Sequence, residues 1–243
     1  MKNLKISLLT LLLLFVYVSV QSQNADEIIA RNIEAMGGKD KINSISSIHI
    51  ENTFTANGNE TTSTTVILNG KGMKNKNEVM GQTMIQCFTD KSGWMINPMY
   101  GSTTPTEMTI EEYNSGNSQL NIGDNFIDYS KKGNKVELLG KERVQDIDAF
   151  KLKVTTSDSI STFYYLDPST FYVLQSSMDA TMLGQPMTII TTYRDYKKTD
   201  YGFVMPHTYD VNYGYQFSLN VNLKKVEFNK PVDPVIFELG NMD

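Results

Sequence analysis

The sequence has very few of the side chains that usually carry covalent or metal chemistry. It contains one cysteine, Cys87, and two histidines, His49 and His207. A single cysteine excludes an internal disulfide framework. The HExxH, CxxC and GxSxG patterns of metal sites, redox sites and serine hydrolases are all missing from the sequence. We therefore expect a protein that is not an enzyme, with no metal, no cofactor and no catalytic residue.

Positive charge is also scarce. Arg31, Arg143 and Arg194 are the only arginines, and the formal net charge is -5 at pH 7. Nucleic acids and anionic membrane surfaces attract proteins through clusters of lysine and arginine, and this sequence has no such cluster. We therefore expect no nucleic-acid partner.

The chain has few long apolar runs, and the longest one lies at its start. Lys2 and Lys5 precede a nearly continuous apolar stretch at residues 6–20, which is the arrangement of a secretory signal peptide. This stretch is shorter than the roughly 20 apolar residues that span a bilayer. We therefore interpret it as a signal peptide that is cleaved near Ser22 and Gln23, rather than as an uncleaved membrane anchor.

The expected signal peptide covers residues 1–22 and leaves residues 23–243 as a single domain, which is long enough for one sizeable β-rich core. No cysteine lies near the cleavage position, so the sequence lacks the box at which bacterial lipoproteins are acylated. We expect an exported protein in the periplasm, with no membrane-spanning segment.

The expected mature chain begins with the pattern of a short amphipathic helix. Asn24 is a favourable cap and Glu27 follows it by three residues, while Gly37 and Gly38 favour the end of the helix. Residues 39–44 extend it by one more turn. The apolar positions fall on one helical face, which needs an apolar surface such as a sheet to pack against. These positions are Ile28, Ile29, Ile33 and Met36.

Most of the remaining chain alternates apolar and polar residues, which is the pattern of half-buried β-strands. The connections are short and turn-like, so neighbouring strands are expected to pair antiparallel. In the last strand the apolar parity switches around Lys224 and Lys225, which predicts a β-bulge that helps the sheet to curl. The expected strands cover residues 48–54, 61–68, 79–89, 94–97, 136–139, 150–155, 162–166, 171–182, 187–193, 204–213 and 216–228.

The middle of the chain interrupts this pattern. Residues 105–113 favour a short helix, with Thr104 as its cap, and residues 114–125 form a polar, glycine-containing stretch. This segment either crosses the open side of the sheet as a lid or links two halves of it.

Methionine is concentrated in two regions. Unbranched, polarizable side chains can adapt to flexible apolar ligands such as acyl chains, although ordinary core filling produces the same pattern. The methionines concerned are Met73, Met80, Met84, Met95, Met99 and Met108, and then Met178, Met182 and Met187.

Several short motifs, taken in order, resemble the LolA-like outer-membrane lipoprotein-sorting proteins that are abundant in Bacteroidetes. The resemblance spans most of the mature chain, and each motif is short. The motifs are MGG at 36–38, GWMINP at 93–98, VELLGKE at 136–142, AFKL at 149–152, YYLDP at 164–168 and PVDPVIF at 231–237.

The resemblance implies a mainly β (α+β) fold, an unclosed antiparallel β-barrel of the LolA/LolB type whose concave side is covered by helices. It also implies a monomeric periplasmic carrier or chaperone that shelters lipid or lipoprotein acyl chains, with lipoprotein-releasing and lipoprotein-accepting envelope proteins as partners. No arginine of this chain matches a lipoprotein-contacting arginine of the carriers. From strand parity we expect Phe54, Met84, Trp94, Met178, Phe217, Leu219 and Val221 to line the cavity, and Ile29, Ile33 and Met36 to form a lid helix.

Two other functions agree with parts of the sequence. A non-catalytic module of the cell envelope that binds a protein through its sheet would have a filled barrel interior. An unrecognised hydrolase would need a cleft in which two ionisable groups converge. Strand parity places residues on a common face, but it does not distinguish a cavity from a packed core.

Overall fold

The computed structural model describes residues 24–56, 59–79, 81–98, 101–123, 126–182, 185–214 and 218–242. The expected signal peptide and Phe217 lie outside these ranges. Within them, no helix is both long and apolar enough to cross a membrane.

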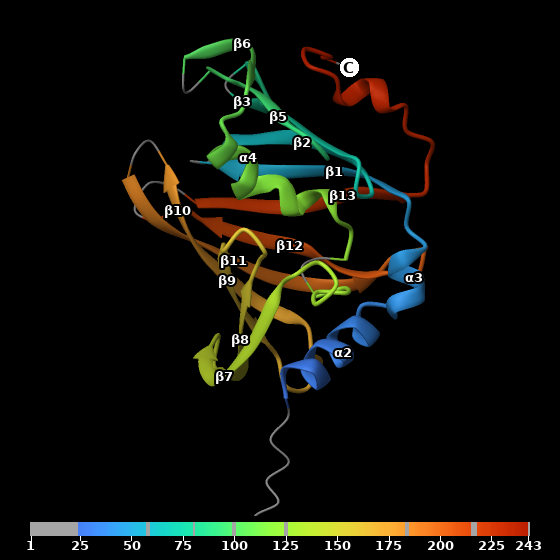
Figure 1. Ribbon diagram of the computed structural model, residues 1–243, viewed down its shortest axis with the longest axis vertical. Helices are drawn as coiled ribbons and strands as arrows, with labels where there is room; N and C mark the ends of the chain where they lie inside the picture. The colour runs from blue at the N-terminus through green and yellow to red at the C-terminus, as the bar shows by residue number, and fades with distance from the viewer. Residues whose placement is uncertain are drawn as a thin grey trace, which may run out of the picture.

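One antiparallel sheet of 13 strands forms the body of the molecule, in the order β6-β5-β4-β3-β2-β1-β13-β12-β11-β10-β9-β8-β7 (Figure 1). Within each half, β1–β6 and β7–β13, strands that follow each other in the chain are neighbours, and β1 joins the two halves by pairing with β13. In the described ranges the edge strands β6 and β7 do not pair with each other, so the barrel is unclosed. The expected fold class is confirmed.

The strand bounds follow the chain in order. In the first half they are β1 (Ser47–Ala56), β2 (Asn59–Leu68), β3 (Gly72–Val79), β4 (Gln82–Thr89), β5 (Gly93–Asn97) and β6 (Ser102–Glu107). In the second half they are β7 (Lys135–Val144), β8 (Ile147–Thr155), β9 (Ser161–Leu166), β10 (Val173–Met182), β11 (Gln185–Lys198), β12 (Val204–Asn212) and β13 (Ser218–Phe228).

Short helices cover one face of the sheet, which we call the inner face, and the opposite face is the outer face (Figure 1). The inner face carries Ile48 and Ile50 of β1, which pack with Ile42 of the second helix. The helices are α2 (Ala25–Ala35), α3 (Lys39–Asn43) and α4 (Ile110–Gly116), with 3-10 turns η2 (Asn117–Leu120) and η3 (Pro234–Phe237).

Helix α2 begins and ends where the sequence predicts. The Asn24 side chain accepts a hydrogen bond of 2.8 Å from the backbone N–H of Glu27. Gly37 and Gly38 then adopt φ values of 119° and 89°, which a residue with a Cβ rarely adopts. The apolar side of α2 packs on β8 and β9 through a cluster that includes Ile28 and Ile29. The expected extra turn is α3.

The segment between the two halves packs on the inner face of β2–β4. Leu120 of η2 contacts the cluster of Met73 and Phe88, and Gly116 ends α4 where a Cβ would overlap the Phe88 ring. The helix begins after Thr109, whose side chain forms a capping box with Glu112, and not after Thr104 as expected. Residues 102–107 form the edge strand β6 instead, where Pro105 is tolerated because an edge strand has an unpaired side.

The expected strand at 79–89 is in fact the second strand of a hairpin, and its partner β3 was not predicted. The sequence of β3, GMKNKNEV, has little apolar alternation. It forms a strand because β2 and β4 supply backbone partners on both of its sides. The bulge expected in β13 is confirmed, because Glu51 pairs with Lys225 and Asn52 pairs with Leu223, which leaves Lys224 as the extra residue.

The C-terminal segment, residues 231–242, covers the outer face of the first half of the sheet. The carbonyl of Phe237 accepts a hydrogen bond of 2.9 Å from the Trp94 indole. The buried Lys74 ammonium donates to the carbonyls of Ile236 (3.2 Å) and Asn241 (2.7 Å). Cys87 lies in the same cluster and is fully buried.

We predict that Phe237→Ala lowers the free energy of unfolding by about 3–5 kcal/mol, because it leaves a cavity where the ring packs over Gly72 and Trp94. Urea denaturation monitored by Trp94 fluorescence measures the change. The matched control is Val235→Ala in the same turn, where the side chain is 42% exposed and the effect should stay within about 0.5 kcal/mol. Equal effects of the two substitutions would contradict the role of this segment.

Candidate functional site

The inner face of the central strands carries a continuous row of large apolar and aromatic side chains. Residues that pair directly across antiparallel strands point to the same side of the sheet. Tyr193 of β11 pairs with Tyr209 of β12, Tyr209 pairs with Val221 of β13, and Val221 pairs with Phe54 of β1. The row therefore crosses the junction between the two halves of the sheet without interruption.

Further apolar residues extend this row along the strands. Val211 pairs with Leu219 one step beyond Tyr209, and Met178 pairs with Ile189 in the next hairpin. Together they form a surface that we call the apolar strip. It consists of Phe54, Met178, Met187, Ile189, Tyr193, Tyr209, Val211, Leu219 and Val221.

Beyond β1 the inner face changes character. On the part of β2–β4 that α4 does not cover, the inner-face side chains are polar but uncharged. Met84 is the apolar exception among them. We call this surface the polar half of the inner face. It consists of Thr61, Ser63, Thr65, Asn75, Asn77 and Gln86.

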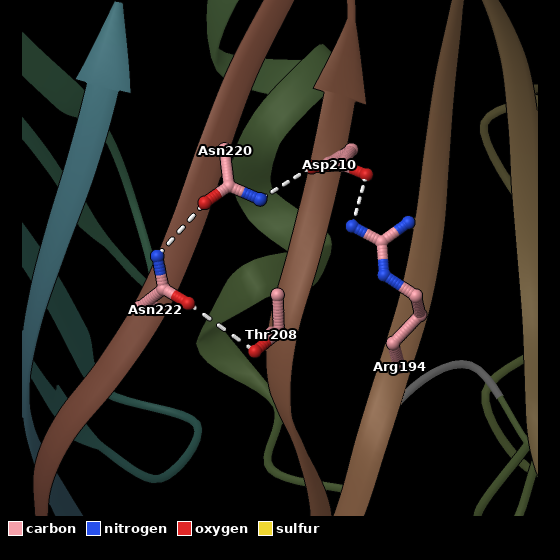
Figure 2. Close-up of polar contacts among 5 residues, drawn as sticks. All are labelled: Arg194, Thr208, Asp210, Asn220 and Asn222. Atoms are coloured by element: carbon pink, nitrogen blue, oxygen red, sulfur yellow. Dashed lines mark hydrogen bonds and ion pairs between the residues drawn. The ribbon is translucent and has the colours of Figure 1, made fainter.

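In the strand segments that carry the apolar strip and the polar half, the charged side chains lie on the outer face. In Figure 2, Arg194 forms an ion pair with Asp210, and Asp210 accepts a hydrogen bond from Asn220, with α4 behind the sheet on its other side. The ladder continues through Asn222 to Thr208. The strand register places the charged residues of β1–β4, β10, residues 190–194 of β11, residues 208–212 of β12 and residues 218–222 of β13 on this face: Glu51, Glu60, Lys74, Lys76, Glu78, Asp179, Arg194 and Asp210.

An apolar pocket of about 170 Å³ lies between α2 and the sheet. Ile33 and Met36 line it from the helix, and Tyr164 and Tyr193 line it from the sheet. An apolar cavity of about 150 Å³ is large enough to take up a molecule the size of benzene. The pocket therefore accommodates the end of an acyl chain but not a whole one. Because Tyr193 also belongs to the apolar strip, the two surfaces are continuous.

A larger open groove of about 530 Å³ lies where the pairing of β12 with β13 ends. Its lining includes Lys198, Asp200, Glu227 and Lys230, so it is less suited to an acyl chain than the pocket under α2. No group of three or more potential metal ligands occurs among the residues that the structure describes.

The structure brings together four of the seven residues that strand parity predicted for the cavity. Phe54, Met178, Leu219 and Val221 lie on the apolar strip. Met84 also faces inward, but it lies in the polar half.

Trp94 is not part of this face. Trp94 pairs with Cys87 of β4, and Cys87 pairs with Lys74 of β3, which is on the outer face. Trp94 therefore lies on the outer face, under the C-terminal segment. Alternation along β5 could not reveal this, because both faces of that part of the sheet are covered.

Of the expected lid residues, Ile33 and Met36 line the pocket, whereas Ile29 is buried in the core between α2 and β8–β9. The tyrosines of the second half were missed. Tyr193 and Tyr209 alternate with polar residues as Leu219 and Val221 do, so strand parity alone could have found them. Asn32, which lines the pocket and donates to the carbonyl of Phe171 (2.7 Å), carried no such signal.

The Tyr209 phenol on the strip is partly desolvated. Burial, reinforced by the neighbouring Tyr193 and Tyr213, raises the pKa of Tyr209 to about 12. An unfolded tyrosine has a pKa of about 10, so the folded state retains this proton to a higher pH than the unfolded state does. The resulting stabilisation is complete below about pH 10 and is lost as the pH rises towards about 12.

We predict that Tyr209→Phe removes a tyrosine ionisation from the high-pH end of the titration curve. The variant should also lose less stability than the wild type between about pH 10 and pH 12. Absorbance at 295 nm as a function of pH measures the transition, and urea denaturation at several pH values measures the stability. A titration curve that keeps all of its high-pH amplitude in the variant would show that Tyr209 is not the desolvated phenol.

Comparison with known proteins identifies the fold. No family model and no curated protein matches the sequence. Among solved structures, a LolA superfamily protein from Nitrosomonas europaea aligns with a TM-score of 0.58 at 11% identity, covering 89% of this chain and 98% of that one. An outer membrane lipoprotein-sorting protein domain from Vibrio parahaemolyticus aligns with a TM-score of 0.56 at 14% identity, covering 87% and 95%.

A third structure, a DUF1329 family protein from Desulfovibrio piger, aligns with a TM-score of 0.56 at 12% identity, covering 87% of this chain and 95% of that one. All three likenesses extend over nearly the whole of the other chain, although the identities are low. The chain thus has the LolA-like fold that its motifs predicted.

Proposed function

We propose that this protein is a non-enzymatic carrier of the cell envelope that shelters a lipid or lipoprotein acyl chain on its inner face. It acts in the periplasm as a monomer, by burial and release, in lipoprotein sorting or envelope lipid transport. It takes its cargo from one envelope protein and passes it to another. The fold shared with a lipoprotein-sorting domain supports this proposal.

The observation that carries the proposal is the uncharged apolar strip that continues into the pocket under α2. Each methylene group removed from water contributes roughly 0.8 kcal/mol. An acyl chain that lies along the strip, with its end in the pocket between Tyr193 and Met36, therefore gains enough to remain bound in an aqueous compartment. A charge on the strip would oppose binding, because no described side chain there could pair with it.

Helix α2 provides a route for loading. It contributes Ile33 and Met36 to the pocket, with Ile42 of α3 and Gly123 beside them, so the chain end is covered by short segments that lie on the sheet. Its C-terminal end is connected to the sheet by the hydrogen bond of 2.9 Å from the backbone N–H of Val204 to the carbonyl of Met36. A small displacement of one helix opens a site more easily than a rearrangement of the sheet does.

The direct test is ligand capture. Protein purified from its native envelope should release acyl lipids that mass spectrometry identifies. After delipidation it should take up a fluorescently labelled fatty acid and a neutral labelled acylglycerol. Clean spectra together with no uptake across several lipid classes would refute the carrier function and favour a module that binds proteins through a filled barrel.

We predict that Leu219→Asp weakens uptake of a labelled acyl chain by roughly tenfold or more, because it places a charge on the apolar strip. Leu219 is half-buried, so the variant should still fold. The matched control is Thr64→Asp, which introduces the same charge at an exposed outer-face position of β2. Fluorescence titration measures both affinities, and circular dichroism checks the fold. Unchanged affinity in Leu219→Asp would exclude the strip as the binding surface.

A further inference from the structure

The side-chain oxygen of one buried polar residue on the inner face has no hydrogen-bond partner among the described residues. Asn52 lies on β1 between Ile50 and Phe54 on the same face, and its side chain is only 7% exposed. Across the strands it pairs with Leu223 of β13 and Ser63 of β2. It therefore lies at the boundary between the apolar strip and the polar half.

The carboxamide oxygen of Asn52 is buried and accepts no hydrogen bond from any residue that the structure describes. Native proteins satisfy roughly 90% or more of their buried polar groups, so an exception on a binding face requires an explanation. Retaining such an acceptor is unfavourable for the protein without its ligand. A leucine at this position would avoid the penalty and would extend the apolar surface of Ile50 and Phe54.

The surroundings of Asn52 restrict the group that can satisfy it. An acyl chain on the strip reaches β1 at Phe54, next to Asn52, and whatever follows the chain then lies over the polar half. A carboxylate at this point would face the carboxamide oxygen and would find no cation, because the charges of β1–β4 are on the outer face. An ester offers only acceptors. An amide N–H offers the donor that the Asn52 oxygen lacks.

We propose that Asn52 is a specificity-determining residue that selects acyl amides. In this arrangement the acyl chain lies on the apolar strip and the amide N–H donates to Asn52 Oδ1. An uncharged head then lies over Ser63 and Asn77 of the polar half. This inference rests on the proposed carrier function and adds to it the chemical class of the ligand.

The test uses two uncharged probes that differ only in an amide N–H against an ester oxygen, N-(2-methoxyethyl)palmitamide and 2-methoxyethyl palmitate, so that the amide N–H is the only donor in either probe. Each displaces a labelled acyl chain from delipidated protein. We expect the wild type to bind the amide roughly tenfold more tightly than the ester, because only the amide satisfies the buried acceptor. In Asn52→Leu both probes should bind, with affinities within about twofold of each other.

The matched control is Thr53→Val at the next position. The Thr53 hydroxyl is also buried without a partner among the described residues, but it lies on the outer face. Its removal should leave the tenfold preference for the amide intact. If Asn52→Leu does not fold, Asn52→Ala serves the same purpose.

The thermal midpoint provides an independent readout. Without ligand, Asn52→Leu should melt at the same temperature as the wild type or higher, because it removes an unsatisfied buried acceptor. A clear decrease would mean that Asn52 has a structural partner, and would overturn the inference. So would equal binding of the two probes to the wild type, or a preference for the ester, and either result would leave the carrier function standing. Failure of both probes to bind would refute the carrier function itself.

Discussion

The pairing of β1 with β13 is the constraint on which the rest of the structure depends. It joins residues near the two ends of the described chain and connects the two hairpin series into one sheet. The bulge at Lys224 lies within this pairing. If β13 alternated regularly through Lys224, with no bulge, Val226 and Phe228 would point to the opposite side from Leu223 and Val221. The bulge allows both sections of β13 to face the helices.

The two faces of the sheet then have different roles. On the outer face of β2–β5 the C-terminal segment closes a core in which Trp94 and Lys74 bond to its backbone. On the outer face of β11–β13 a ladder of charged and amide side chains is linked by hydrogen bonds (Figure 2). Among the described residues, the inner face combines the apolar strip, the pocket under α2 and the unpaired Asn52 oxygen. The proposed binding surface therefore lies where the described strand segments carry no charge.

The elements that could be predicted are those whose local pattern and tertiary environment agree. Strand β13 and helix α2 were found because their buried positions are apolar at the period of their own secondary structure. Strand β3 was missed because its sequence is polar and its neighbours supply the hydrogen bonds that make it a strand. The helix in the middle was displaced because Thr109, with Glu112, caps better than Thr104. The predicted site residues show the same contrast. Strand parity placed Phe54 and Val221 on one face correctly, but it placed Trp94 on that face when it lies on the opposite one.

By itself the sequence determined an antiparallel, curled sheet with one amphipathic helix, the location of its bulge, and a lack of residues for covalent or metal chemistry. These are properties of local periodicity and composition. Only the tertiary structure decided which face carries the apolar strip and the pocket, that Tyr193 and Tyr209 belong to the strip, and that the Asn52 side-chain oxygen has no partner among the described residues. Each of these depends on register between strands that are distant in the chain, and a pattern within one strand contains no information about what covers it.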